Sequence, residues 1–416
     1  MSGQSTSRDD KPRIGLALAG GGLEGAVYEI GALRALEESL DGIDFSRDVH
    51  VYVGVSAGAF IASCLANGLS TTQLVRAIVK LERTQHPFVP EIFFKPALKE
   101  MVRRGLMTPR LLVEGMLDYL RNPQDQTLFE SMARLSRALP VGLFDNEPIR
   151  AYLKNIFSMK GRTDDFRELE RSLIVVAADL DSGEAVRFGE PGHDDVPISK
   201  AVQASTALPG LYPPVLIDDR HYVDGVLLKT LHASVALNSG TELVFCLNPI
   251  VPVDTEDAVA AGVMRRGKLI DRGLLTVLSQ TFRTMVHSRL SVGMASYTPR
   301  YPGQEVVLIE PPRDDYRMFF TNIFRFSSRK AVAEHAYNGT RKQLLERREE
   351  IEPVLERSGI RYRDEMLQDP DRDLWKGVGI GEPEPTAPVG EELDDALTRL
   401  EFLLERLESA ELVSNR

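Results

Sequence analysis

Short apolar runs that alternate with helical patterns are the feature that most restricts the fold of this chain. An example is LIVVAADL at residues 173–180, an unbroken run of the kind that suits a strand buried on both faces of a sheet. Helices between such strands cover the two faces, so we predict an α/β fold with three layers and a mainly parallel central sheet. The expected strands are residues 14–19, 49–54, 173–178, 185–188, 221–223, 243–247 and 306–309, and the expected helices include 24–39, 57–67 and 72–83.

The alternation is interrupted twice and stops before the C-terminus. Residues 84–145 carry only helical patterns, which we interpret as an inserted helical cap, and residues 254–297 form a largely continuous amphipathic helical segment. A later Pro/Gly-rich stretch is typical of a linker, and leucines at helical spacing follow it. We expect this last helix to be solvated, with self-association as the alternative. The predicted organisation is a disordered N-terminus over 1–12, a main domain over 13–345, an extension over 346–380, a linker over 381–390 and a terminal amphipathic helix over 391–412.

Composition and charge exclude several classes of function. The formal net charge of −11 over 416 residues argues against general nucleic-acid binding, which needs a basic surface. No run approaches the roughly 20 apolar residues that span a bilayer, and the polar N-terminus lacks the apolar core of a secretion signal. Cys64 and Cys246 lie in apolar contexts, which favours buried free thiols over a disulfide or a metal site. We therefore expect a globular protein of the reducing cytoplasm.

The first expected strand ends in a glycine-rich turn, ALAGGGLEG, and a helical pattern follows it. Gly20, Gly22 and Gly25 match the G-x-G-x-x-G spacing with which backbone amides approach a dinucleotide pyrophosphate. The same amides, unpaired at the start of a helix, can instead stabilise the oxyanion of an acyl-transfer reaction. The turn alone predicts an anion-binding loop and leaves both ligands open.

The second expected strand enters the turn GVSAG, which has the G-x-S-x-G pattern of a nucleophile elbow. Such an elbow holds Ser56 on a strained turn, and glycines at positions 54 and 58 prevent collisions with the neighbouring backbone. The serine then projects at the positive end of the following helix, where developing negative charge is stabilised. Ser56 is therefore the candidate nucleophile, flanked by Gly54 and Gly58.

A nucleophilic serine needs a base, because its hydroxyl is a weak nucleophile at neutral pH. The chain has seven histidines, none with an obvious triad signature, and His221 and His232 are the best of them. Asp224 is the better candidate, since it follows an apolar run and precedes a glycine at an expected strand end, where α/β sheets place their sites. An ordinary Asp-Gly turn is the structural alternative.

Four ordered motifs, GGGLEG, GVSAG, ASTALPGLYPPV and VDGV, occur within residues 14–230. In this order they resemble the patatin-like phospholipase family, and the resemblance continues more weakly through residues 306–344. It implies that 13–345 is a catalytic domain that hydrolyses lipid esters without a metal or an organic cofactor. The site that the resemblance implies has no catalytic histidine and consists of a dyad of Ser56 and Asp224 with an oxyanion hole at Gly20, Gly21 and Gly22.

Two positions depart from the family's pattern. The family usually has a basic residue where this chain has Glu24, and Gly or Ala where Val226 follows the Asp-Gly pair. Glu24 suits the positive start of a helix but adds negative charge near the expected oxyanion. An ordinary carboxylate is a poor base for serine in water, so we expect an apolar cap to dry the site. The apolar, mainly aromatic cluster of that cap is Phe88, Ile92, Phe93 and Phe94.

Residues 263–294 carry a basic amphipathic pattern within an acidic protein. Such a stretch suits peripheral contact with an anionic membrane surface. The alternative is a helix that packs its apolar face on the sheet and leaves its arginines in solvent. Sequence alone leaves both open. The basic residues are Arg265, Arg266, Lys268, Arg272, Arg283 and Arg289.

The sequence is compatible with three functions. The first is a serine lipid acyl hydrolase acting on a lipid ester or phospholipid. The second is a non-catalytic lipid-binding or scaffold protein on the same fold, for which Glu24 is the main argument. The third is a dinucleotide-binding protein, which is disfavoured because the second strand ends in GVSAG instead of an acidic residue that holds a ribose.

Overall fold

An eight-stranded sheet forms the centre of the computed structural model, which describes residues 12–79, 94–98, 100–102, 104, 139–260, 269–313, 315 and 328–378. Five parallel strands run in the order β4-β3-β1-β8-β9, and shorter antiparallel strands complete the sheet beside β4. The predicted mainly parallel sheet is confirmed. The strands are β1 (Ile14–Leu18), β3 (Val49–Val55), β4 (Ser172–Asp179), β5 (Ala185–Phe188), β6 (Val215–Ile217), β7 (Arg220–Asp224), β8 (Leu243–Leu247) and β9 (Glu305–Ile309).

The central strands are apolar on both sides because each side faces a separate hydrophobic cluster. In β3, Tyr52 belongs to one cluster, whereas Val51 and Val53 belong to the other. Successive side chains of a strand point to opposite faces, so an unbroken apolar run is what a doubly covered sheet requires. The two clusters are the two interfaces of a three-layer α/β/α architecture.

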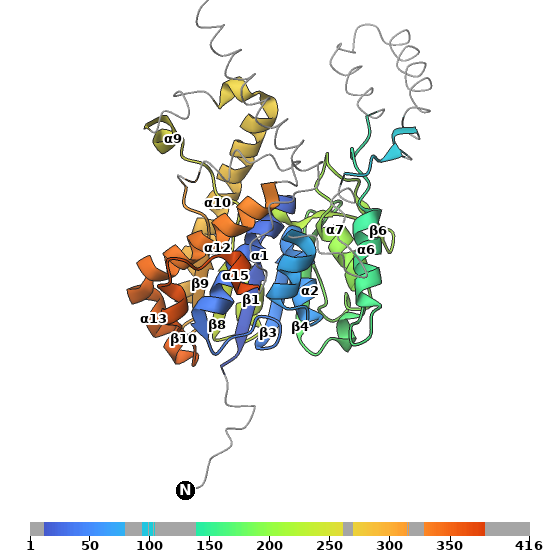
Figure 1. Ribbon diagram of the computed structural model, residues 1–416. Helices are drawn as coiled ribbons and strands as arrows, with labels where there is room; N and C mark the ends of the chain where they lie inside the picture. The colour runs from blue at the N-terminus through green and yellow to red at the C-terminus, as the bar shows by residue number, and fades with distance from the viewer. Residues whose placement is uncertain are drawn as a thin grey trace, which may run out of the picture.

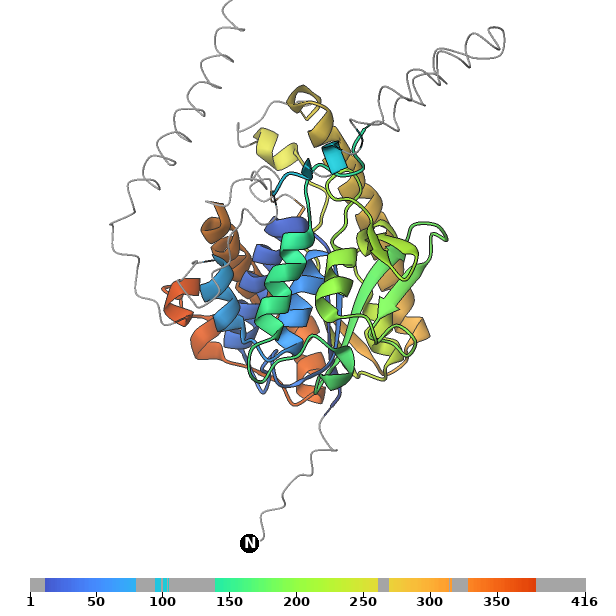
Figure 2. The ribbon, with the colours of Figure 1, turned by 90° about the vertical axis from the view of Figure 1, so that its right-hand side faces the viewer.

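Helices cover both faces of the sheet (Figures 1 and 2). The first cluster lies under α1, α2, α6, α7 and α12, and the second lies under α8 and the C-terminal half of α10. Two of these helices, α1 and α2, follow directly from strands β1 and β3, as the alternation of patterns predicts. Their bounds are α1 (Gly22–Ser39), α2 (Ala57–Ala66), α6 (Glu147–Phe157), α7 (Ile198–Ser205), α8 (Ala233–Asn238), α10 (Leu274–Arg300) and α12 (Arg329–Glu346).

Two of the expected helical segments differ in the structure. The helix expected over 72–83 is α3 (Thr71–Leu74), begun by a Ser70 capping box, and it continues as a π-helix over Val75–Val79. The amphipathic segment expected over 254–297 is divided into α9 (Glu256–Ala260), a 3₁₀ turn over Ile270–Arg272, and α10. Gly273, with a φ of 84°, separates the turn from α10, because this left-handed conformation favours glycine.

The extension predicted over 346–380 packs on the main domain as far as it is described. It contains α13 (Arg348–Arg357), α14 (Asp364–Leu367), α15 (Leu374–Gly377) and β10 (Arg361–Tyr362), which pairs antiparallel with β2 (Leu40–Asp41). Leu374 and Val378 are buried in the first cluster. Residues 1–11, most of the cap over 84–145, the linker over 381–390 and the terminal helix over 391–412 lie outside the described residues.

Two further findings bear on the expectations from composition. Cys64 and Cys246 are both buried free thiols, as predicted. Burial in apolar surroundings raises the pKa of each thiol, to about 12 for Cys64. Within the part of the chain that the structure describes, we find no helix with the length and apolarity that crossing a bilayer demands.

Candidate active site

Ser56 occupies a sharp turn between β3 and α2. Its φ of 54° is positive, which is rare for a residue other than glycine and indicates local strain. The two flanking glycines make this turn sterically feasible: a Cβ on Gly54 would lie 2.4 Å from the Cα of Ala59, and one on Gly58 would lie 2.5 Å from the carbonyl of Leu18. The geometry is that of a nucleophile elbow, with Ser56 at the N-terminal end of α2.

Strand pairing brings Asp224 to this turn. Residues 175–178 of β4 pair with β5 along one edge of β4. Both β3 and β7 pair with residues of this same stretch, so they must lie along the other edge. They run toward each other along it: Val55 is opposite Val176, and Asp224 is opposite the next residue, Ala177. The carboxyl ends of two strands far apart in the sequence therefore meet, and the residues at those ends are Ser56 and Asp224.

The two side chains are directly hydrogen-bonded. The Ser56 hydroxyl donates to Asp224 Oδ2 at 2.6 Å, and the Val226 amide donates to Oδ1 at 2.9 Å. Asp224 is only 1% exposed. Burial raises the pKa of Asp224 to about 7, although both hydrogen bonds favour the carboxylate and oppose the shift. Such a carboxyl changes its charge near neutral pH, as a general acid and base must.

Ser205, at the end of α7, is a site residue to which the sequence assigned no role. The Ser56 backbone N–H donates to Ser205 Oγ at 2.8 Å, and the Ser205 hydroxyl donates to the Val176 carbonyl at 2.6 Å. This buried bridge ties the elbow to β4. Its only sequence signal is its place in the motif ASTALPG, which does not indicate what the residue does.

The glycine-rich loop lies beside the dyad. The Gly20 amide already donates to the Thr230 carbonyl at 3.3 Å, whereas Gly21 and Gly22 line the cavity in front of Ser56. A Cβ on Gly21 would lie 2.7 Å from Pro249 Cγ, and Gly22 has a φ of 62°. Glycine is therefore favoured at position 21 because a side chain would collide with its neighbour, and at position 22 because of the backbone conformation.

The two candidate histidines lie away from the cavity. His221 is exposed on β7, and His232 is buried at the start of α8, where burial lowers its pKa to about 3. Neither lines the cavity, and no other histidine does so among the described lining residues. The described residues also contain no group of three or more His, Cys, Asp or Glu side chains placed to hold a metal ion.

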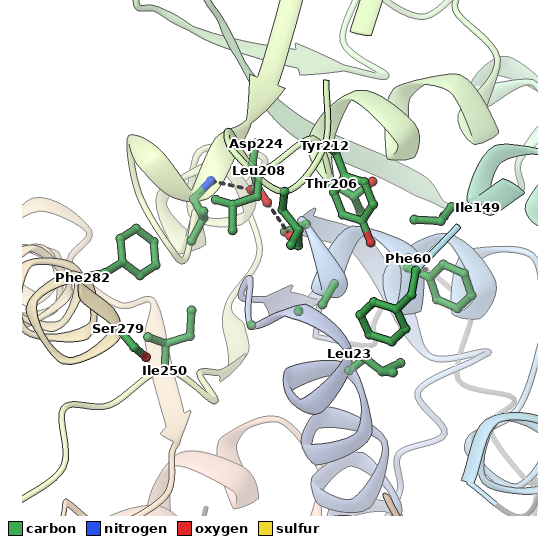
Figure 3. A pocket seen from close by; sticks show the side chains of 18 of the residues that line it. Leu23, Phe60, Ile149, Thr206, Leu208, Tyr212, Asp224, Ile250, Ser279 and Phe282 are labelled. Carbon is green, nitrogen blue, oxygen red and sulfur yellow. Dashed lines mark hydrogen bonds between the residues drawn. The ribbon is translucent and has the colours of Figure 1, made fainter. Parts of the chain in front are cut away.

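A largely apolar cavity of about 230 Å³ opens over the dyad. Figure 3 shows that α1 and α2 contribute Leu23 and Phe60 on one side, while Ser279 and Phe282 of α10 face them from the other. Phe94, from the predicted aromatic cluster, also lines the cavity and packs edge-on against Phe144 with ring centroids 5.6 Å apart. Phe88, Ile92 and Phe93 lie outside the described residues. The cavity suits an acyl chain whose ester reaches Ser56.

The sequence predicted that Glu24 adds negative charge near the oxyanion, but the environment of its carboxyl in the structure opposes that charge. Its side chain is buried in the first turn of α1, and its Oε1 has no hydrogen-bond partner among the described residues. Burial raises the pKa of Glu24 to about 8, with the Arg283 guanidinium opposing the shift and Asp315 adding to it. Burial therefore favours the neutral form of this carboxyl.

Comparison with known proteins identifies one family model. Residues 16–237, slightly more than half of the chain, match the model described as patatin-like phospholipase. The chain is also 23% identical over 212 residues to the uncharacterised protein R571 of Acanthamoeba polyphaga mimivirus. That match covers 50% of this chain and 57% of the viral protein, so the chain spans less than two thirds of that relative.

Solved structures with a similar arrangement include two bacterial proteins and one human protein. VipD from Legionella pneumophila is 16% identical, with a TM-score of 0.38, over 81% of this chain and 67% of VipD. The type III effector ExoU, known from Pseudomonas aeruginosa, is 16% identical, with a TM-score of 0.32, over 80% and 54% of the two chains. Human GIVD cytosolic phospholipase A2, solved with methyl γ-linolenyl fluorophosphonate, is 12% identical, with a TM-score of 0.28. The match covers 63% of this chain and 43% of the human protein.

Proposed function

This chain belongs to the patatin-like phospholipase family, and we propose that it is a lipid acyl hydrolase that works through a Ser56–Asp224 dyad. The observation that carries the proposal is the 2.6 Å hydrogen bond from the Ser56 hydroxyl to the buried Asp224 carboxylate at the base of an apolar cavity. Nucleophile and base lie within the distance that proton transfer requires. The substrate class follows from the family and from the apolar lining.

In the first half of the proposed reaction, Ser56 Oγ attacks the carbonyl carbon of a lipid ester and its proton passes to Asp224. The tetrahedral intermediate collapses by breaking the bond to the alcohol oxygen, which receives the proton from Asp224. The fatty acyl group remains on Ser56 as an ester. In the second half, Asp224 takes a proton from water, the hydroxide displaces the acyl group as a free fatty acid, and the proton returns to Ser56.

We assign the oxyanion hole to the amides of Gly21 and Gly22. These residues line the cavity at the start of α1, an 18-residue helix whose N-terminus supplies partial positive charge. Gly20, the third glycine predicted for this role, donates its amide to Thr230 and supports the loop instead. The family match favours this function of the loop over dinucleotide binding.

The apolar surroundings make an aspartate an adequate base in this proposal. In water a carboxylate of ordinary pKa is too weak to activate a serine hydroxyl. Burial raises the pKa of Asp224 to about 7, which brings its affinity for a proton closer to the requirement of the reaction. The cavity therefore holds the acyl chain and also raises the basicity of Asp224.

We also propose that α10 contacts the lipid surface from which the substrate is drawn. Leu274 and Leu278 lie one helical turn apart on α10 and are exposed by 72% and 53%, and Ile270 in the preceding 3₁₀ turn is exposed by 72%. The next position in this row is Phe282, which lines the cavity. The N-terminal half of α10 rises beyond the carboxyl edge of the sheet (Figures 1 and 2), so the apolar row leads from the outside to the dyad.

The test of the hydrolase is cleavage of a medium-chain nitrophenyl ester and of mixed lipid vesicles by the wild type, Ser56→Ala and Asp224→Asn. We expect the wild type to cleave both, and each variant to lose at least 10³-fold in kcat while retaining its thermal unfolding midpoint. An inactive wild type would favour a lipid-binding scaffold. A fully active Asp224→Asn would exclude Asp224 as the base.

A further inference from the structure

The cavity over the dyad has two arms that end differently. Figure 3 shows Ser279 and Phe282 of α10 on one side of Asp224, and Phe60 and Ile149 on the other. Ser279 is exposed and Phe282 is half-buried, whereas Phe60 and Ile149 are both buried. The arm beside α10 therefore opens to the outside, and the arm between α2 and α6 is closed. We call them the open arm and the closed arm.

The closed arm ends in the core of the protein. Ile149, in the first turn of α6, has no exposed surface and belongs to the first hydrophobic cluster. Phe60 of α2 lies in the same cluster, and its ring stacks on that of Tyr152 of α6 with centroids 6.2 Å apart and an interplanar angle of 10°. An acyl chain that enters this arm therefore meets packed side chains and not solvent.

Hydrogen bonds hold this end wall at a fixed distance from the nucleophile. At the start of α6, Asn146 Nδ2 donates to the Gln203 carbonyl at 3.2 Å, and Gln203 Nε2 donates to Asn146 Oδ1 at 3.1 Å. Gln203 lies on α7, the helix that also carries Ser205, whose Oγ accepts the Ser56 amide. The elbow and the helix that carries Ile149 are thus both tied to α7.

The size of the cavity limits the chain that the closed arm can hold. The whole cavity measures about 230 Å³, which is below the roughly 300–1,000 Å³ that is usual for small-molecule sites. The closed arm is only part of this volume. A close-packed interior does not expand for a longer ligand without a cost in free energy. Chain length is therefore a property that this arm can select.

We propose that Ile149 is a specificity-determining residue that forms the end of the acyl-binding arm, so that esters of short acyl chains are preferred over esters of long ones. The acyl chain lies in the closed arm, and the alcohol part of the ester extends through the open arm toward α10. This inference rests on the proposed hydrolase and deepens it. Each methylene beyond the fitted length either displaces packed side chains or stays in water, and both are unfavourable.

The experiment compares p-nitrophenyl hexanoate with p-nitrophenyl decanoate, and the readout is the ratio of kcat/KM for decanoate to kcat/KM for hexanoate. We expect the wild type to favour hexanoate. In Ile149→Ala the ratio should rise at least tenfold, because one methylene in an apolar pocket changes kcat/KM by about 10- to 200-fold. Ile149→Val removes a single methyl group and perturbs the core less, so it should raise the ratio by a smaller factor even if Ile149→Ala does not fold. An unchanged ratio in the folded variants, or a wild type that favours decanoate, would overturn the proposal.

Two other isoleucines provide matched controls. Ile156 lies on the same helix and is 6% exposed, but it is absent from the described cavity lining. Ile250 is also 6% exposed and lines the open arm (Figure 3). We expect Ile156→Ala and Ile250→Ala to leave the ratio within about twofold of the wild type, well below the change expected for one methylene. An equal rise in Ile156→Ala would show a loosened core, and a rise in Ile250→Ala alone would place the acyl chain in the open arm; either result would overturn the proposal.

A separate measurement distinguishes failure of this inference from failure of the hydrolase. If the wild type cleaves neither ester, the proposed hydrolase fails, and calorimetry then measures the binding of hexanoate and decanoate to the wild type and to Ile149→Ala. We expect the variant to shift the ratio of the two dissociation constants at least tenfold in favour of decanoate. An unchanged ratio would refute the role of Ile149 as the end of the arm.

Discussion

Asp224 is almost completely removed from solvent, yet it accepts hydrogen bonds from Ser56 and from the Val226 amide. Burial favours its neutral form and the two donors favour its ionised form, and burial is the stronger effect. The outcome is a carboxyl with a pKa of about 7. A residue of this kind accepts a proton from serine more readily than a solvated aspartate and can still return it to a leaving group.

The first prediction concerns the dependence of catalysis on pH. Only ionised Asp224 can accept the Ser56 proton, so kcat/KM should rise with pH and reach half of its plateau near pH 7, the pKa of Asp224 in the free protein. The measurement is a pH–rate profile on a soluble neutral ester that does not titrate in this range. A half-maximum near pH 4, the ordinary range for aspartate, would contradict the assignment of a buried base.

The second prediction concerns Ser205, which we consider a positioning residue. Ser205→Ala removes the acceptor of the Ser56 amide, so the elbow loses its tie to β4. We expect kcat to fall roughly 10- to 100-fold with little change in KM, since the nucleophile is displaced while the acyl cavity is kept. Steady-state kinetics on one ester separates the two constants.

Ser199→Ala is the control for this experiment. Ser199 lies on the same helix, is equally buried and binds Asp164, but it does not contact the elbow. Ser205→Ala removes two buried side-chain hydrogen bonds and Ser199→Ala removes one that is part-buried, so each variant should lose stability, about 1–3 kcal/mol. If Ser199→Ala lowers kcat as much as Ser205→Ala does, loss of stability explains the effect and Ser205 has no positioning role.

At the scale of elements, α10 performs two tasks along one helix. Its C-terminal half packs on the sheet through Leu290 and Tyr297, which are buried in the second cluster together with Val286 near the middle of the helix. Its N-terminal half exposes apolar side chains and lines the cavity. The helix carries three arginines and no acidic residue. The sequence left two alternatives open for this segment. In our proposal, the C-terminal half of the helix packs on the sheet and the N-terminal half contacts a membrane.

The third prediction tests the exposed half of α10. In the double variant Leu274→Ser/Leu278→Ser we expect at least tenfold weaker binding to anionic phospholipid vesicles, because two large apolar side chains no longer enter the lipid surface. Cosedimentation measures the binding. Cleavage of a soluble ester should remain within about twofold of the wild type, since both residues lie outside the cavity lining.

Val292→Ser is the matched control for vesicle binding. Val292 is 71% exposed on the same helix, in the half that packs on the sheet. Its substitution should leave vesicle binding unchanged. Equal loss in the control, or no loss in the double variant, would contradict a lipid-contacting role for the N-terminal half.

At the scale of the whole molecule, the C-terminal extension completes the first hydrophobic cluster. Leu374 is fully buried there, and the Arg372 guanidinium donates to Glu38 of α1 at 3.1 Å. Arg341 of α12 donates to the carbonyls of Met366 and Leu367. Segments more than 300 residues apart in sequence are thus joined in one core, and we expect them to unfold together.

The fourth prediction tests this joint core. Leu374→Ala should lower the free energy of unfolding by about 2–5 kcal/mol, because it leaves a cavity in a packed interior. Leu345→Ala on α12 is the control, since Leu345 is 42% exposed and should cost far less. Urea unfolding followed by circular dichroism gives both values. A negligible effect of Leu374→Ala would show that the extension does not belong to the stabilising core.

The sequence predicted the central strands and the turn at Ser56 well because each has a local signature. The catalytic roles of Ser56 and Asp224 stay a prediction. Runs rich in apolar residues mark β1, β3, β4 and β8, and the glycines around Ser56 mark a turn that few residues permit. The three-residue strand β6 and the two-residue strands β2 and β10 were not predicted, since such short segments carry no periodicity and depend on their partners.

Long-range relations account for the features of the site that could not be predicted from the sequence. The hydrogen bond between Ser205 and Ser56 depends on how α7 packs, and the raised pKa of Glu24 depends on burial by elements far along the chain. The position of Arg283 in the cavity wall depends on how α10 packs. A pattern in a short stretch of sequence cannot predict these features, because they arise only when the sheet and helices pack together.

The most direct test of the central claim is covalent labelling with an alkyl fluorophosphonate, which reacts with activated serines, followed by intact-mass and peptide analysis. We predict one adduct per chain, located on Ser56, absent from Ser56→Ala and formed at least 100-fold more slowly in Asp224→Asn. Exposed serines in the same protein are the internal control. Labelling at another serine, or labelling of Ser56 at the same rate without Asp224, would contradict the Ser56–Asp224 dyad.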